Sequence, residues 1–193
     1  MVSIFQQKPS VSQVQNSNML KLVGVAVLAM ATVVLTVSHA RAADKLAPED
    51  KSFLTNAAEA GNAEINASQL ALQKSSDPEI KNFAQRMFKD HSQVGEDLKK
   101  LATAKGVTVP DDPAMAAKAK ILLLSKLDGH NFDKQYAGMI GVSAHKDAVT
   151  LFKKAAASAK DPDIKQFATI NLPTLQQHLE MAQELKTSVD AEK

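Results

Sequence analysis

The chain has 193 residues, no cysteine and a formal net charge of +2 from 23 basic and 21 acidic side chains. The absence of cysteine excludes disulfides and lipid attachment through an N-terminal cysteine. Residues 1–42 contain Lys8, Lys21 and Arg41 but no acid, so the remainder has one more acidic than basic side chain. Such a near-neutral domain offers no overall electrostatic footprint for nucleic acid or anionic lipid, and we expect no nucleic-acid partner.

The first 42 residues differ in composition from the rest of the chain. Residues 22–37 are a run of apolar or small residues, and Ala40-Arg41-Ala42 has the small-x-small spacing of a signal peptidase site. The run is short for a membrane span, which needs about 20 apolar residues. We interpret 1–42 as a cleaved signal peptide, with an uncleaved anchor as the alternative. We therefore predict export to the periplasm or cell envelope, with outer-membrane association left open.

Residues 43–193 are predicted to form one all-α domain without membrane insertion, because the sequence is rich in Ala, Leu, Lys and Glu and no segment alternates with period two. The helices are predicted over residues 49–75, 78–105, 114–128, 132–158 and 162–188. Pro173 lies inside the last of them and is expected to kink it. Leu122-Leu123-Leu124 is interpreted as the packed face of the short third helix.

One motif occurs twice and defines the expected topology. Asp77-Pro78 and Asp161-Pro162 each provide an N-cap aspartate and a proline at the first helical position, followed by an acid in the first turn. Each corner should fold two long helices into a hairpin. The long connection from Gly106 to Asn131 would let the second and third long helices run parallel. This arrangement is a ferritin-like four-helix bundle of two hairpins, joined by a connection that contains a short helix.

Each long helix carries one metal-competent residue in its apolar stripe, near its middle: Glu64, His91, His145 and His178. Glu64 and His91 are almost equally far from the first corner along the chain, and the other two are almost equally far from the second corner. Residues at equal distances from a hairpin corner lie side by side, so all four should converge near the bundle midplane.

Three neutral imidazoles and a carboxylate suit Zn²⁺, Fe²⁺ or Mn²⁺, and we predict a transition-metal site at these four residues. Asp90 is predicted to accept a hydrogen bond from an imidazole N–H outside the ligand set. The alternative is a metal-free Glu–His network that fixes helix register. His130 is expected to be solvated. No catalytic residue is assigned, because nucleophile–base arrangements and phosphate-binding loops are absent from the sequence.

A set of motifs resembles an exported bacterial family catalogued as domain of unknown function 4142, in the ferritin-like superfamily and labelled "predicted outer membrane protein". The motifs are Phe53-Leu54…Ala57-Ala58, Asp77-Pro78…Phe83-Ala84…Met87, Lys89-Asp90-His91, Phe132-Asp133…Tyr136, His145…Leu151-Phe152 and Leu172-Pro173-Thr174-Leu175…His178-Leu179. The resemblance covers residues 46–188 and implies a ferritin-like bundle and export, but no activity.

Two departures bear on function. Ala144 precedes His145, where family members often have aspartate, and the Glu-x-x-His pattern of di-iron helices is absent because Phe88 and Leu175 occupy its acidic positions. We expect a non-enzymatic envelope protein for metal handling or stress tolerance, acting with an envelope partner. The alternatives are a metal-dependent oxidase or peroxide-handling enzyme, and a metal-free structural or interaction protein.

Overall fold

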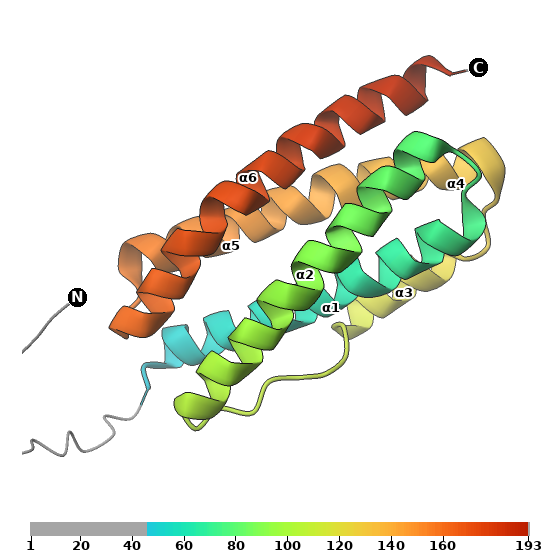
Figure 1. Cartoon of the computed structure of the whole chain (residues 1–193). Helices are drawn as coiled ribbons and strands as arrows, with labels where there is room; N and C mark the ends of the chain where they lie inside the picture. The colour runs from blue at the N-terminus through green and yellow to red at the C-terminus, as the bar shows by residue number, and fades with distance from the viewer. Residues whose placement is uncertain (1–45, 193) are drawn as a thin grey trace, which may run out of the picture. The chain divides into compact units, whose positions relative to one another are not determined.

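Two helical hairpins, each turned at an Asp-Pro corner, build the protein (Figure 1). The computed structural model describes residues 46–192, which belong to one compact unit; the predicted signal segment 1–42 lies outside this range. The elements in chain order are α1 (Pro48–Lys74), α2 (Pro78–Ala104), α3 (Met115–Leu124), α4 (Gly129–Tyr136), the π-helix η1 (Ala137–Ala144), α5 (His145–Ser158) and α6 (Pro162–Ala191). The predicted all-α four-helix bundle is confirmed.

The two corners have the predicted N-caps. Asp77 Oδ1 accepts hydrogen bonds from the backbone N–H groups of Glu79 and Ile80, at 2.6 and 3.1 Å. Asp161 Oδ1 accepts the corresponding bonds, at 2.9 and 3.2 Å. These contacts satisfy N–H groups that have no partner within the helix, so each corner begins its helix with a defined geometry.

The second corner is also fastened to the opposite hairpin. Asp50, in the first turn of α1, is buried and accepts hydrogen bonds from the backbone N–H groups of Lys160 and Asp161. Lys105, just after α2, pairs with Asp161 at 2.7 Å and with Asp163 at 2.5 Å. The open end of the first hairpin, where α1 begins and α2 ends, thus holds the turn of the second hairpin.

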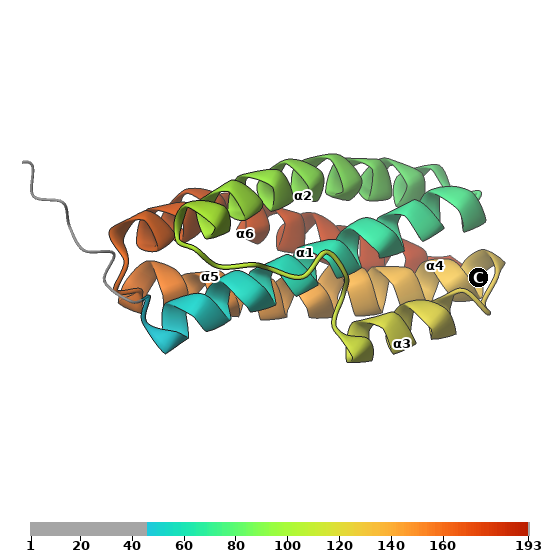
Figure 2. The same ribbon diagram turned by 90° about the horizontal axis from the view of Figure 1, so that it is seen from below.

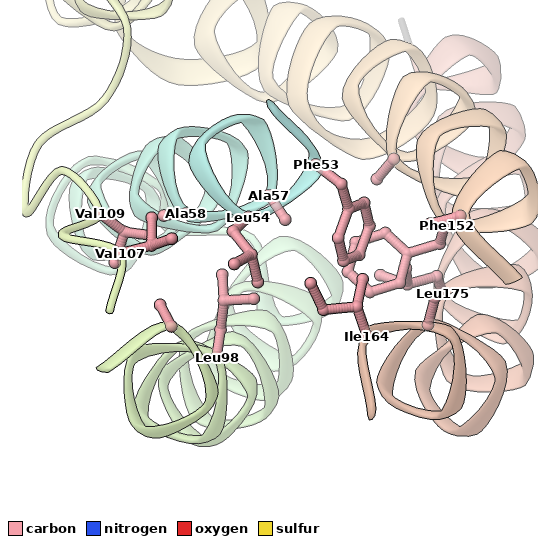
Figure 3. Packing of buried hydrophobic residues seen from close by; sticks show 14 residues of the cluster. Phe53, Leu54, Ala57, Ala58, Leu98, Val107, Val109, Phe152, Ile164 and Leu175 are labelled. Carbon is pink, nitrogen blue, oxygen red and sulfur yellow. The ribbon is translucent and has the colours of Figure 1, made fainter. Parts of the chain in front are cut away.

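Helix α2 and the continuous helix α4–η1–α5 run parallel, as the long connection predicts (Figure 2). One core cluster joins Leu98, late in α2, to Phe152, late in α5. The other joins Phe83, early in α2, to Phe132, early in α4. Figure 3 shows the first cluster, in which Phe53 meets Phe152 edge to face with ring centroids 5.1 Å apart. The core therefore has two apolar halves, one at each end of the bundle.

Three local predictions need correction. Residues 137–144 form a π-helix within the segment predicted as an ordinary α-helix. Gly129 begins α4 with φ +52°, a left-handed conformation that glycine adopts without strain, whereas this helix is predicted to begin at residue 132. Leu122 and Leu123 are exposed, at 60 and 66 %, and only Leu124 of the three leucines is packed. Within residues 46–192, the helices lack the combined length and apolar character of a membrane span.

Candidate metal centre

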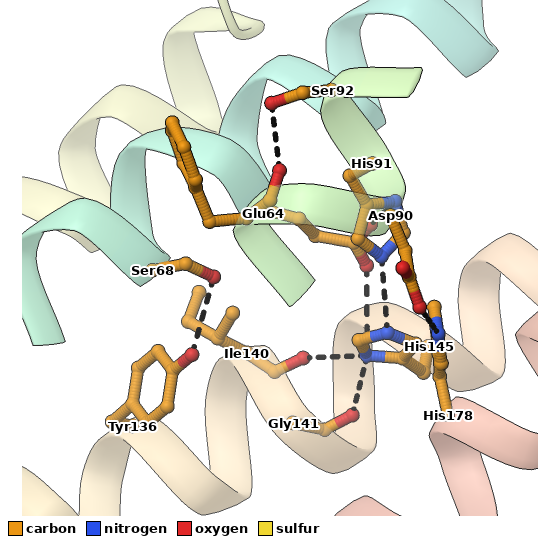
Figure 4. A network of polar contacts seen from close by, with 11 residues as sticks. Glu64, Ser68, Asp90, His91, Ser92, Tyr136, Ile140, Gly141, His145 and His178 are labelled. Carbon is orange, nitrogen blue, oxygen red and sulfur yellow. Dashed lines mark hydrogen bonds and ion pairs between the residues drawn. The ribbon is translucent and has the colours of Figure 1, made fainter. Parts of the chain in front are cut away.

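A layer of polar side chains separates the two apolar halves of the core (Figure 4). Its central members are Glu64, His91, His145 and His178, and their exposed fractions are 2, 4, 0 and 1 %. Each comes from a different long helix, as the repeated spacing from the corners predicts. Burial of four ionisable side chains at one level is costly unless they satisfy each other or bind an ion.

The π-helix positions His145. Its Nδ1 lies 2.8 Å from the carbonyl oxygen of Gly141 and 3.1 Å from that of Ile140. A carbonyl only accepts hydrogen bonds, so Nδ1 must carry the proton. In the neutral ring, Nε2 then has a free lone pair directed into the bundle centre. π-Helical turns are frequent at functional sites, and here the altered turn supplies both acceptors.

Glu64 orients His91 so that Nδ1 of this ring, like that of His145, faces an oxygen acceptor. Glu64 Oε2 lies 3.0 Å from His91 Nδ1, so Nδ1 donates to the carboxylate and Nε2 is left with the lone pair. Burial lowers the pKa of His91 below its usual value, although the Glu64 charge opposes this shift. The neutral ring is therefore favoured at neutral pH.

Asp90 orients His178 through the other ring nitrogen. His178 Nε2 donates to Asp90 Oδ2 at 3.0 Å, which is an acceptor contact of the kind expected for Asp90. His178 Nδ1 is buried and has no hydrogen-bond partner among residues 46–192. Burial is the main reason why the pKa of His178 is lowered to about 4, and the nearby His91 lowers it further. This imidazole is neutral at pH 7 and has an unused lone pair.

The three rings surround one point. Their centroids are 5.3–5.6 Å apart, and one nitrogen from each lies within 4.8 Å of the others. His91 Nε2 and His145 Nε2 are 3.4 Å apart, although neither carries a proton when both rings are neutral. Two opposed lone pairs repel unless a cation or a hydrogen-bond donor lies between them. Tetrahedral zinc, with bonds of about 2.0–2.1 Å, separates two nitrogen ligands by roughly 3.3–3.4 Å, so the donor set fits such an ion.

Glu64 occupies a different place from the three nitrogens. Its two oxygens face Nδ1 of His91, at 3.0 Å, and Nδ1 of His145, at 3.6 Å. Both contacts lie on the ring edges opposite to Nε2. Glu64 Oε1 has no hydrogen-bond partner in the described part of the chain. The carboxylate thus lies on the Nδ1 side of both rings as a hydrogen-bond acceptor. Its role as a metal ligand stays a prediction.

Several groups that shape the histidine cluster have only weak signals in the sequence. The acceptor carbonyls of Ile140 and Gly141 belong to the backbone, and only the small residue at 141 hints at their role. A Cβ on Gly141 would lie 3.3 Å from Ala182 Cβ, so glycine lets η1 approach α6 closely. Ser68 and Tyr136 form a buried hydrogen bond of 3.2 Å beside the site, and burial raises the pKa of the tyrosine. His130 is exposed and remains outside the cluster.

A pocket leads from the surface to this layer. It has a volume of about 290 Å³ and lies between α1, α2 and the segment that follows α2. Glu64 and His91 line its inner end, and Pro110 and Asp111 form part of its wall. Asn62 donates to the carbonyl of Pro110 at 3.0 Å, which holds this wall against α1. The pocket gives small molecules a route towards His91.

The fold and this site define an all-α helical bundle with a buried three-histidine cluster. The chain belongs to the family described as "Domain of unknown function (DUF4142)", whose model matches residues 35–185. No curated protein matches it significantly.

Two solved structures are similar in fold. A DUF305 fragment from Deinococcus radiodurans has a TM-score of 0.65 and 14% sequence identity, covering 74% of this chain and 98% of that chain. A conserved hypothetical protein, rv2844, from Mycobacterium tuberculosis has a TM-score of 0.55 and 17% identity, covering 75% and 93%. At such identities the likeness shows the fold alone.

Proposed function

We propose that this protein is an exported, non-enzymatic helical bundle that binds one transition-metal ion through His91, His145 and His178, and serves in metal handling or stress tolerance in the cell envelope. The observation that carries the proposal is the 3.4 Å approach of His91 Nε2 to His145 Nε2, with an oxygen acceptor beside Nδ1 of each ring. The remaining ring nitrogens donate to oxygen acceptors, which is how proteins orient metal-binding imidazoles.

The donor set favours zinc among the predicted metals Zn²⁺, Fe²⁺ and Mn²⁺. Three imidazole nitrogens, two of them 3.4 Å apart, suit Zn²⁺, whereas Mn²⁺ is better served by oxygen ligands. Glu64 and Asp90 would act through the rings that they orient, since each accepts a hydrogen bond from an imidazole N–H. Their negative charges also offset part of the charge of the ion.

The test is the metal content of residues 43–193, purified without a His tag and measured by mass spectrometry after loading with Zn²⁺. We expect about one equivalent in the parent protein, in line with a single three-histidine site. His145→Ala should lose it, and His130→Ala, which changes an exposed histidine outside the cluster, should retain it. Circular dichroism verifies that each variant folds. Absence of metal from the folded parent, also after loading with Fe²⁺ or Mn²⁺, would overturn the proposal.

Glu64→Gln separates an orienting role from a ligand role. The amide oxygen of glutamine still accepts a hydrogen bond from His91 Nδ1, so a protein that uses Glu64 only for orientation should keep its stoichiometry and lose roughly tenfold in affinity. Loss of the bound ion would instead make Glu64 a ligand. Competition titration with a chromogenic chelator measures this difference.

A metal-dependent oxidase or peroxide-handling enzyme is the second candidate, and the pocket that reaches His91 favours it. Three protein ligands leave a fourth position for a small molecule, as in catalytic zinc sites. Consumption of hydrogen peroxide, or oxidation of Fe²⁺, by the loaded parent but not by His145→Ala would establish this alternative. Metal binding without either activity supports the non-enzymatic role.

A further inference from the structure

Helix α3 lies in the long connection between α2 and α4, outside the four-helix core. It carries apolar residues on its inner and its outer face. Leu124 and Ile121 turn inwards and pack against the second core cluster. Met115, Leu122 and Leu123 point outwards and are 79, 60 and 66 % exposed. Figure 2 shows α3 lying along the outside of the bundle, beside α1. Its outer face is therefore an apolar surface without a partner in the described structure.

The domain as a whole is near neutral, but the charged side chains within α3 itself are all lysines. Lys118 and Lys120 flank the apolar residues on either side of the helix, and Lys126 follows directly; all three are exposed. The segment Met115–Leu124 contains no acid. Lys118 pairs with the exposed Asp112 at 3.1 Å, an ion pair that solvent weakens. The exposed face of α3 thus offers both attractions that hold a protein at an anionic lipid interface, namely burial of apolar side chains and contacts of lysines with headgroups.

We propose that the outer face of α3, formed by Met115, Leu122 and Leu123 with Lys118, Lys120 and Lys126, docks the folded domain onto an anionic lipid surface. The apolar side chains enter the boundary between headgroups and acyl chains. The lysines extend their ammonium groups to the lipid phosphates. The helix lies parallel to the membrane and does not cross it, in agreement with its ten residues.

The size of the surface favours lipid over a second copy of the chain. A helix of ten residues is about 15 Å long, so its outer face offers on the order of 150–200 Å². A stable protein dimer buries about 800 Å² on each partner. Interfacial helices need no such area, because a few inserted side chains and several cationic contacts add up to reversible binding. This surface is independent of the metal centre, so either proposal can fail alone.

The test is co-sedimentation of residues 43–193 with vesicles of phosphatidylcholine alone, or of equimolar phosphatidylcholine and phosphatidylglycerol. Residues 46–192 contain both core clusters and form one compact unit, so this fragment is complete as a folding unit. We expect binding to the anionic vesicles, at least tenfold weaker binding to the neutral ones, and loss of affinity as salt is added.

Two matched variants locate the contact. Leu123 and Ile170 are exposed to almost the same extent, 66 and 64 %, but Ile170 lies on α6. Leu123→Ser should weaken vesicle binding by about tenfold, whereas Ile170→Ser should leave it unchanged. Neither change touches the core, so both proteins should melt like the parent.

Three results would overturn the proposal. They are absence of binding to anionic vesicles, equal effects of Leu123→Ser and Ile170→Ser, and a concentration-dependent dimer that only Leu123→Ser dissociates. Light scattering on the same samples detects the dimer, which would assign the surface to self-association instead of lipid.

Discussion

Acid should destabilise the metal-free protein through His178, whose pKa falls from 6.5 in the free side chain to about 4 in the fold. Between about pH 7 and 4 the unfolded chain then binds more protons than the folded one, so stability decreases as the pH falls through this window. For one group with these pKa values, lowering the pH from 7 to 5 costs about 2 kcal/mol of unfolding free energy. His91 is shifted in the same direction and adds to the decrease.

The assay is urea unfolding of chelator-treated protein at pH 7, 6 and 5, with His178→Gln as the variant. Glutamine does not titrate, and its amide can still donate to Asp90. The variant should therefore lose about 2 kcal/mol less than the parent between pH 7 and 5. His130→Gln, which changes an exposed histidine, should follow the parent. Equal pH dependence of His178→Gln and the parent would refute the assignment of a neutral, buried His178.

Two further predictions concern packing and the second corner. Gly141→Ala places a Cβ 3.3 Å from Ala182 Cβ and should destabilise the fold by about 1–3 kcal/mol, whereas Gly61→Ala, which has open space around it, should stabilise α1 by about 0.5–1 kcal/mol. A stabilising Gly141→Ala would contradict the close approach of η1 to α6. Asp50→Ala removes the acceptor of the Lys160 and Asp161 N–H groups and should cost about 2–3 kcal/mol in thermal or urea unfolding. Glu49→Ala, its exposed neighbour, should change stability by less than about 0.5 kcal/mol, and equal effects of the two would refute the fastening role.

The bundle and the level of its polar layer follow from local rules. Asp77-Pro78 and Asp161-Pro162 determine where helices begin, and the rise per residue brings Glu64 beside His91 and His145 beside His178. The rotation of individual rings does not follow from these rules. Which nitrogen of His91 faces Glu64 depends on packing between helices, and spacing along one chain contains no such information.

The π-helix and the outer face of α3 show two limits of predicting structure from sequence patterns. Residues 137–144 contain no proline to mark an altered turn, so their π-helical conformation has no signal in the sequence. In α3, leucines at successive positions cannot all face one side of a helix, since neighbours are about 100° apart. A run of three leucines therefore predicts at least one outward side chain, although not which partner it meets.

The division of the core makes both apolar clusters depend on the last helix of the chain. Helix α6 contributes Ile164 and Leu175 to one apolar cluster and Leu185 and Val189 to the other, and His178 to the layer between them. A nascent chain that ends before Pro162 consequently lacks part of the core at both ends and one wall of the polar layer. Addition of the last thirty-residue helix therefore completes both apolar clusters and the polar layer together.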